Sequence, residues 1–326
     1  GPSFAAMGSL VCAFLLCADA RRARKLFYVV AWAGAAYAVF AIAAFLFDPT
    51  RVLWREKLAY RNALTGTFIN RNTAAAFFGT CAVVWLALLG DGLRRLMPPG
   101  SRDVVGSVLR APVGRRRKLG LYAGMWALCC IAMLMTLSRA GILLSLAAML
   151  AAVLTILQLF GTGGGGRFDE GGFADEARLA AYRATLRMIA DHPWLGTGLG
   201  TFAWSFPPYR GSDVTLLWVW DRAHSTALEI VAEMGIPFAI LVFAAWVTMF
   251  VVLVHGVRTR RRGRVYPCTA LALFSMVSLH SLIDFPLQIP GFAIVAFALV
   301  GAGLAQSMRP LESTRRRRAG AANSAY

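Results

Sequence analysis

An arginine and a histidine stand where they could act on a charged substrate. Arg139, in the string TLSRAG (136–141), is a lone cation between two long apolar runs. A guanidinium stays ionised and binds phosphate oxygens in pairs, so Arg139 is a candidate anion clamp. An arginine at a membrane interface can also serve packing alone, with its charged head in water, and this alternative stays open.

His224, in DRAHS (221–225), is the candidate general base. Imidazole changes its charge near neutral pH, which suits proton removal from a hydroxyl. The competing interpretation is a structural histidine that forms a hydrogen bond at a helix terminus. His280, four residues before Asp284, is a second candidate.

Other chemistries find little support in the sequence. The six cysteines lie in or beside apolar runs without a CxxC pair, which favours helix packing over disulfides or metal binding. His, Cys, Asp and Glu show no metal-ligand spacing, so we expect neither a metal nor a cofactor. The glycine-rich string GTGLG (196–200) is not preceded by a predicted strand and is interpreted as a turn.

The elements that must position these residues are apolar runs of membrane length. Of the 326 residues, 58% are hydrophobic and 15% are charged, unlike an ordinary soluble enzyme. Runs of about 18 residues are long enough to cross a hydrocarbon core as helices. The sequence therefore predicts an all-α, polytopic membrane helix bundle with one large helical periplasmic loop. The runs cover residues 4–18, 26–47, 73–90, 119–137, 140–160, 236–254, 266–283 and 288–306.

The net charge of +18 lies in four short segments, which hold 22 of the 34 basic residues and four of the 16 acidic ones. The positive-inside rule assigns such connections to the cytoplasm. We therefore expect contact with membrane lipids and no nucleic-acid partner. The segments are 19–25, 91–118, 255–266 and 309–318.

These features divide the chain into four regions. Residues 1–160 hold about five transmembrane segments, and 161–224 form the periplasmic loop with an amphipathic helix at about 174–191. Residues 225–308 hold about three further segments, and 309–326 form a basic cytoplasmic tail. The chain opens without Met and with a short first run, which suggests an N-terminal truncation.

The crossing count contains a conflict. The charge rule places both Arg139 and the loop from 161 outside, yet only the run 140–160 separates them. That run would have to be re-entrant, form one bent crossing with the run before it, or have lost a helix near 147–153. We favour the loss of a helix.

Several strings together resemble the O-antigen ligase and O-antigen polymerase family. They are GTFINRNTAAAFF (66–78), TLSRAG (136–141), ARLAAYRATLRMIADHPWLGTGLGTF (177–202), DRAHSTALEIVAEMGIP (221–237) and HSLIDFPLQIP (280–290). The resemblance follows the whole chain in order, although family members are longer and normally place two crossings between SRAG and the loop.

The resemblance implies a metal-independent, inverting glycosyltransferase of the bacterial inner membrane. Such enzymes move a glycan from undecaprenyl diphosphate to an acceptor hydroxyl, on a lipid or a glycan, at the periplasmic face. The family's functional residues correspond to Arg139, to Arg178 in the loop and to His224. Arg210, Arg222 and Glu233 are further candidates for orienting sugar or phosphate; they complete the set of predicted site residues.

Three alternatives remain. The chain could be a polysaccharide polymerase of the same family, or an inactive fragment. It could also be a polysaccharide transporter or flippase, although the sequence shows no internal repeat and few charges inside its apolar runs.

Overall fold

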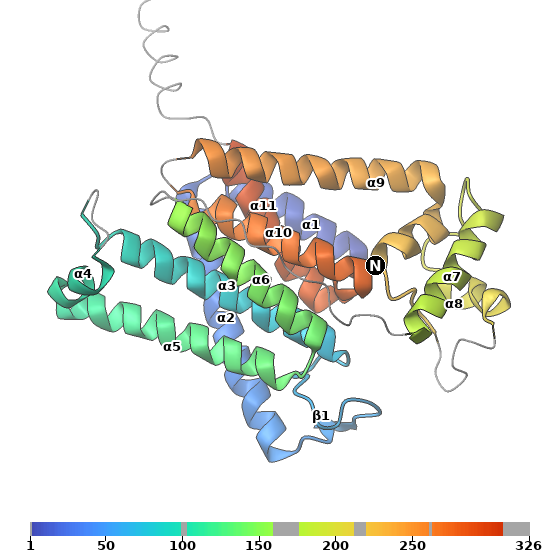
Figure 1. Ribbon diagram of the computed structural model, residues 1–326, viewed down its shortest axis with the longest axis horizontal. Helices are drawn as coiled ribbons and strands as arrows, with labels where there is room; N and C mark the ends of the chain where they lie inside the picture. The colour runs from blue at the N-terminus through green and yellow to red at the C-terminus, as the bar shows by residue number, and fades with distance from the viewer. Residues whose placement is uncertain (1, 99–102, 159–175, 212–219, 261–262, 309–326) are drawn as a thin grey trace, which may run out of the picture.

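The computed structural model is an α-helical bundle (Figure 1). It describes residues 2–98, 103–158, 176–211, 220–260 and 263–308. The helices are α1 (Pro2–Leu16), α2 (Ala20–Phe47), α3 (Arg71–Arg94), α4 (Val104–Arg110), α5 (Val113–Met135), α6 (Arg139–Gln158), α7 (Glu176–Asp191), α8 (Phe202–Ser205), α9 (Thr226–Thr259), α10 (Val265–Ile283) and α11 (Pro290–Met308). Two-residue strands, β1 (Arg51–Val52) and β2 (Arg55–Glu56), form a small hairpin, and Pro207–Tyr209 and Pro286–Gln288 form 3-10 turns.

Each of the eight predicted apolar runs has most of its length in a helix of the described structure, which confirms the fold class. In the described part of the chain, six helices are long and apolar enough to cross a membrane, namely α2, α3, α5, α9, α10 and α11. The chain is therefore a multi-pass membrane protein. The apolar parts of α1 and α6 within the described residues are shorter.

Helix α3 lies at the centre of the bundle and packs against α2, α5, α6 and α10. Its Trp85 is fully buried and donates from Nε1 to the carbonyl oxygen of Ala31 at 3.1 Å. Small residues let the neighbouring backbones approach closely, because Gly34 of α2 faces Cys81 and Gly79 of α3 faces Ser145 of α6. The central helix is thus held by close packing on several sides.

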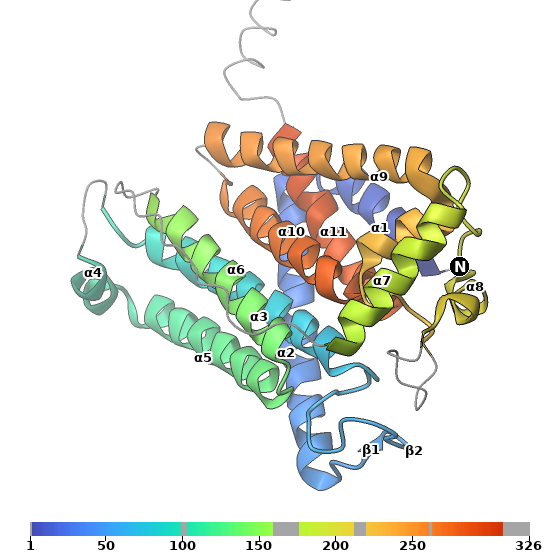
Figure 2. The same ribbon diagram turned by 45° about the vertical axis from the view of Figure 1, so that its right-hand side comes forward.

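The bundle has two distinct ends. We call one the loop end; there α3 and α6 begin, α5 and α10 end, and α7 and the β-hairpin lie. The opposite end, the basic end, holds the described parts of the segments 19–25, 91–118 and 255–266, with α4 at its extreme (Figure 2). Segments 261–262 and 309–326 lie outside the described residues.

The crossing conflict persists in the structure. Helix α6 is one continuous helix from Arg139 to Gln158, so it is neither re-entrant nor a bent pair with α5. Its 20 residues span about 30 Å and end away from the loop end, where α7 lies. The connection, residues 159–175, including the predicted linker GTGGGG, lies outside the described residues.

Helix α7 matches the predicted amphipathic helix in position but not in its buried face. The helical spacing of Leu179, Tyr182, Leu186 and Ile189 predicts one apolar face, yet Leu179 and Leu186 are 40% and 54% exposed. The helix buries Ile189 of this face, and with it Ala181, Ala184 and Met188, together with the aromatic residues that follow the helix. Small side chains on α7 let the helix approach its neighbours closely. Hydrophobic periodicity alone does not predict this packing.

The distribution of charge predicts which end faces the cytoplasm. In a chain whose native cysteines are replaced, we expect a membrane-impermeant maleimide to label Leu199→Cys, at the loop end, from outside the cytoplasmic membrane. Arg258→Cys, at the basic end, should react only after that membrane is opened, because basic segments stay inside. The reverse labelling pattern would show the opposite orientation.

Candidate active site

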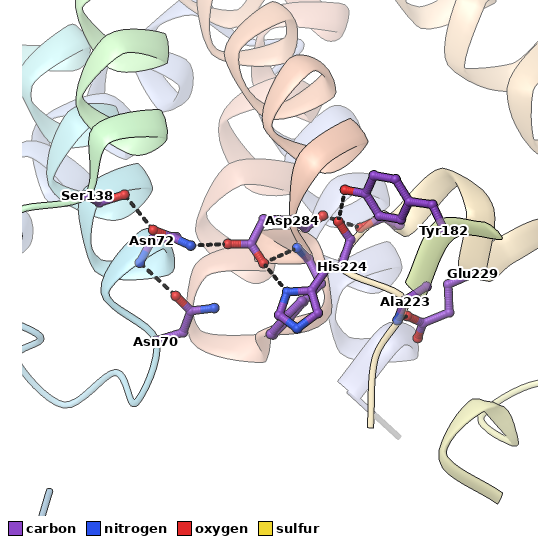
Figure 3. A network of polar contacts seen from close by, with 10 residues as sticks. Asn70, Asn72, Ser138, Tyr182, Ala223, His224, Glu229 and Asp284 are labelled. Atoms are coloured by element: carbon purple, nitrogen blue, oxygen red, sulfur yellow. Dashed lines mark hydrogen bonds and ion pairs between the residues drawn. The ribbon is translucent and has the colours of Figure 1, made fainter. Parts of the chain in front are cut away.

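A chain of buried polar contacts crosses the loop end of the bundle (Figure 3). Ser138 donates from Oγ to Oδ1 of Asn72 at 2.6 Å, and Asn72 donates from Nδ2 to Oδ2 of Asp284. The other carboxylate oxygen of Asp284 lies 3.6 Å from Nδ1 of His224. Ser138 is fully buried and Asp284 is 2% exposed. The four side chains come from the connections and ends of α3, α5, α6, α9 and α10, so this contact chain ties together elements far apart in sequence.

Three helix N-termini meet near these contacts. Asn70 caps α3 by accepting from the backbone N–H of Asn72, and Ser138 accepts from the N–H of Gly141 in α6. Ser225 caps α9. Because a helix N-terminus carries partial positive charge, this end of the bundle favours an anionic group.

His224 is held in an unusual backbone conformation. Its φ is +52°, a value that non-glycine residues rarely adopt, and its carbonyl oxygen accepts from the hydroxyl of Tyr182 at 2.9 Å. Trp220 and Phe285 contact the imidazole edge-on, with ring centroids 5.2 and 5.1 Å away. Leu137, directly before Ser138, has a φ of +53°. Such strain clusters at functional sites, and here it occurs on both sides of the contact chain.

The orientation of the imidazole suits a general base. Nδ1 of His224 faces the carboxylate of Asp284, so a proton on Nδ1 leaves the lone pair of Nε2 to accept another. The distance of 3.6 Å is longer than a hydrogen bond, and such contacts often tighten when substrate binds. The side chain is 28% exposed, so it is held by the protein and still accessible.

Asp284 provides the negative charge. Burial tends to raise the pKa of its carboxyl, but contacts with His224 and Asn72 and the nearby His280 outweigh this effect, and the net direction is downward. The carboxylate therefore stays ionised near neutral pH. An ionised partner stabilises the imidazolium that forms when His224 takes a proton.

One predicted catalytic residue, His224, lies on the contact chain, and a second, Arg139, directly follows its member Ser138 in sequence. Arg139 is the exposed first residue of α6, directly after Ser138, and His224 lies at the other end of the chain. Arg178 lies in α7, one turn before Tyr182, whose hydroxyl binds the backbone of His224. The side chain of Arg178 lies outside the described part of the structure.

The predicted substrate residues are placed differently. Arg222 pairs with the buried Glu229 at 3.1 Å, and Glu229 also accepts from the N–H of Ala223, which fixes the residue before His224. Arg210 is half-buried directly after the 3-10 turn whose last residue, Tyr209, accepts from Arg187. Arg222 therefore belongs to the segment that holds His224, whereas Arg210 lies beside α7.

Glu233 clamps the glycine-rich turn onto α9. Its carboxylate accepts from the N–H groups of Gly200 and Phe202, both at 2.9 Å. Gly196 and Gly235 have φ of +65° and +76°, and a side chain on either would collide with the facing backbone. This geometry favours a structural role for Glu233 over the expected substrate contact, and it agrees with a turn at 196–200.

Among the described residues, no three His, Cys, Asp or Glu side chains gather closely enough to hold a metal ion. The described groups of the loop end that attract an anion include arginines and helix N-termini.

Residues 118–244 match the family model described as O-antigen ligase. This segment belongs to the O-antigen ligase family. The match supports a glycosyltransferase of the ligase or polymerase type. No curated protein matches the chain.

The O-antigen ligase segment contains Arg139, Arg178 and His224, whereas Asn72 and Asp284 lie outside it. Sequence reasoning did not select Asn72, Ser138 or Asp284 as site residues. The available signal was their position, since all three stand at ends of apolar runs that the charge pattern places on one side. Their pairing depends on how α3, α6 and α10 pack.

The contact between Asp284 and His224 predicts a positioning role for the carboxylate. In Asp284→Asn, the neutral amide no longer stabilises the imidazolium, so we expect kcat for glycan transfer to fall on the order of 10²–10⁴-fold with little change in KM. Asp221→Asn, an exposed change three residues before His224, is the control. Wild-type kcat in Asp284→Asn would refute the role.

The clamp at Glu233 predicts a loss of stability. Glu233→Ala leaves the N–H groups of Gly200 and Phe202 without their acceptor, at a cost on the order of 2–4 kcal/mol. Glu233→Gln keeps one acceptor oxygen and should lose less. Thermal unfolding in detergent measures the order of stability. A raised KM with unchanged stability would instead indicate a substrate contact.

Proposed function

We propose that this chain is an inner-membrane glycosyltransferase of the O-antigen ligase type, acting in surface or exopolysaccharide assembly. It moves a glycan from undecaprenyl diphosphate to an acceptor hydroxyl at the periplasmic face. The observation that carries the proposal is the His224–Asp284 pair, which Asn72 and Ser138 connect to the start of α6, within and next to the segment that matches the family.

The position of this pair supports a substrate that lies in the membrane. The pair sits at the loop end, opposite the basic segments that the positive-inside rule keeps in the cytoplasm. Asp284 directly follows the apolar helix α10, so the contact chain lies where transmembrane helices end. A donor with a lipid tail in the bilayer would present its diphosphate at this level.

The proposed reaction is a direct displacement. The acceptor oxygen attacks the anomeric carbon as Nε2 of His224 takes the hydroxyl proton. The bond between the anomeric carbon and the phosphate oxygen breaks, and undecaprenyl diphosphate leaves with the bonding electrons. Attack from the face opposite the leaving group inverts the anomeric centre.

The leaving group requires positive charge as it departs. We assign this role to Arg139 and Arg178, since guanidinium groups bind phosphate oxygens bidentately and stay charged. The N-termini of α3 and α6 add partial positive charge at the same end. Because these groups supply the charge, we propose a metal-independent reaction.

The acceptor separates ligase from polymerase. A ligase joins the glycan to a lipid acceptor once, whereas a polymerase adds repeats to a second glycan. The family match supports both types. An assay with each acceptor distinguishes them. A ligase forms one product with a lipid acceptor, whereas a polymerase forms a series of longer glycans with a lipid-linked glycan acceptor.

The test is glycan transfer by purified protein in detergent, with an undecaprenyl-diphosphate-linked oligosaccharide as donor. We expect His224→Ala to lower the transfer rate on the order of 10²–10⁴-fold, because it removes the base, with membrane insertion and thermal stability retained. The control is His192→Ala, which changes an exposed histidine in the same loop.

Two outcomes would contradict the proposal. Transfer by His224→Ala at the wild-type rate would show that His224 is not the general base. A wild-type protein that transfers nothing in detergent but moves the donor across sealed vesicles would be a transporter.

A further inference from the structure

The basic end of the bundle contains a cavity of about 340 Å³ that the proposed reaction does not use. It lies between the start of α2, the end of α3 and the starts of α5 and α10. Along α3, 16 residues separate Leu88 of the cavity wall from Asn72 of the contact chain, a rise of about 24 Å. The cavity is therefore distinct from the candidate active site.

Four cationic side chains lie in the wall of this cavity. Arg24, Arg95, Arg115 and Lys118 line it, and Asp91 is the one acidic group among its described lining residues. Asp91 is already paired with Arg95, with Oδ2 2.7 Å from Nη2. The lining residues thus carry a net charge of +3, and an anion in the cavity would relieve their mutual repulsion.

Three tyrosines add hydroxyl groups to the same wall. The hydroxyls of Tyr28 and Tyr122 lie 2.7 Å apart in a hydrogen bond, and the guanidinium of Arg24 interacts with the hydroxyl of Tyr266. The ammonium of Lys118 lies 5.7 Å from the ring centroid of Tyr122. Hydroxyls beside guanidinium and ammonium groups form a donor set suited to phosphate oxygens.

The surroundings of the cavity favour a lipid as the source of the phosphate. Leu88, Leu119 and Val265 contribute apolar wall. The neighbours of the two hydrogen-bonded tyrosines face outward, since Val29 of α2 is 56% exposed and Leu121 of α5 is 44% exposed. Acyl chains could follow these apolar surfaces while the headgroup enters the charged cavity.

We propose that this cavity binds the phosphate headgroup of an anionic phospholipid at the cytoplasmic side. Basic pockets between transmembrane helices commonly bind such headgroups. The site would hold the basic ends of α2, α3, α5 and α10 together, because one phosphate would neutralise cations from several helices.

The experiment measures phosphatidylglycerol binding to the full chain in neutral detergent, by native mass spectrometry and by the rise in unfolding temperature. Phosphatidylcholine and inorganic pyrophosphate are the comparison ligands. Arg115→Gln/Lys118→Gln removes two lining charges, and Arg116→Gln/Arg117→Gln removes two exposed charges on the same helix that do not line the cavity.

We expect the lining variant to weaken phosphatidylglycerol binding on the order of tenfold or more, and the control variant by less than about threefold. Phosphatidylcholine and pyrophosphate should leave the unfolding temperature unchanged. If the lining variant fails to fold, Arg24→Gln replaces it. This variant removes a lining charge contributed by α2, and phosphatidylglycerol binding should again weaken.

Two results would overturn the proposal. Equal loss of binding in both double variants would show a diffuse attraction to the basic surface. Stabilisation by pyrophosphate as strong as that by phosphatidylglycerol would assign the cavity to a soluble phosphate.

Discussion

The buried carboxylate of Asp284 is the constraint on which the loop end depends. An ionised group this deeply enclosed is costly unless neighbours compensate its charge. Asn72 and His224 provide that compensation from two other elements, and Ser138 fixes the amide of Asn72 in turn. The same contacts that make the charge tolerable therefore place the start of α6, with Arg139, within one short contact chain of the imidazole.

The helices that meet there also separate two kinds of charge environment. At the loop end, helix N-termini lie near a histidine–carboxylate pair; at the other end, three arginines and one lysine line a cavity. Helix α3 connects the two, with Asn72 near its first residue and Asp91 in its last turn. Because α3 packs closely against α2 and α6, it holds the side chains at both of its ends in fixed positions. The glycine-rich turn clamped by Glu233 gives similar support where α9 kinks at Gly235.

Prediction from sequence succeeded where one residue property repeats along a helix. Apolar length located the transmembrane helices, because the hydrophobic requirement of a bilayer is local to each segment. It failed for the face of α7, where Ala181 and Ala184 pack inward and Leu186 does not. For α7, the deciding factor is the shape of a neighbour from another part of the chain. A substrate contact of Glu233 stays a prediction, while its carboxylate accepts from two backbone N–H groups.

The sequence by itself therefore determined the helical membrane class, the helices, the basic segments and the candidates Arg139 and His224. These follow from hydrophobicity, charge and side-chain chemistry, which each residue carries alone. Only the tertiary structure decided that Asp284 faces Nδ1 of His224, that Asn72 links this carboxylate to Ser138, and that cations from α2, α5 and the end of α3 share a cavity. Such contacts join residues up to 212 positions apart, and their distances are set by helix packing, which no local pattern encodes.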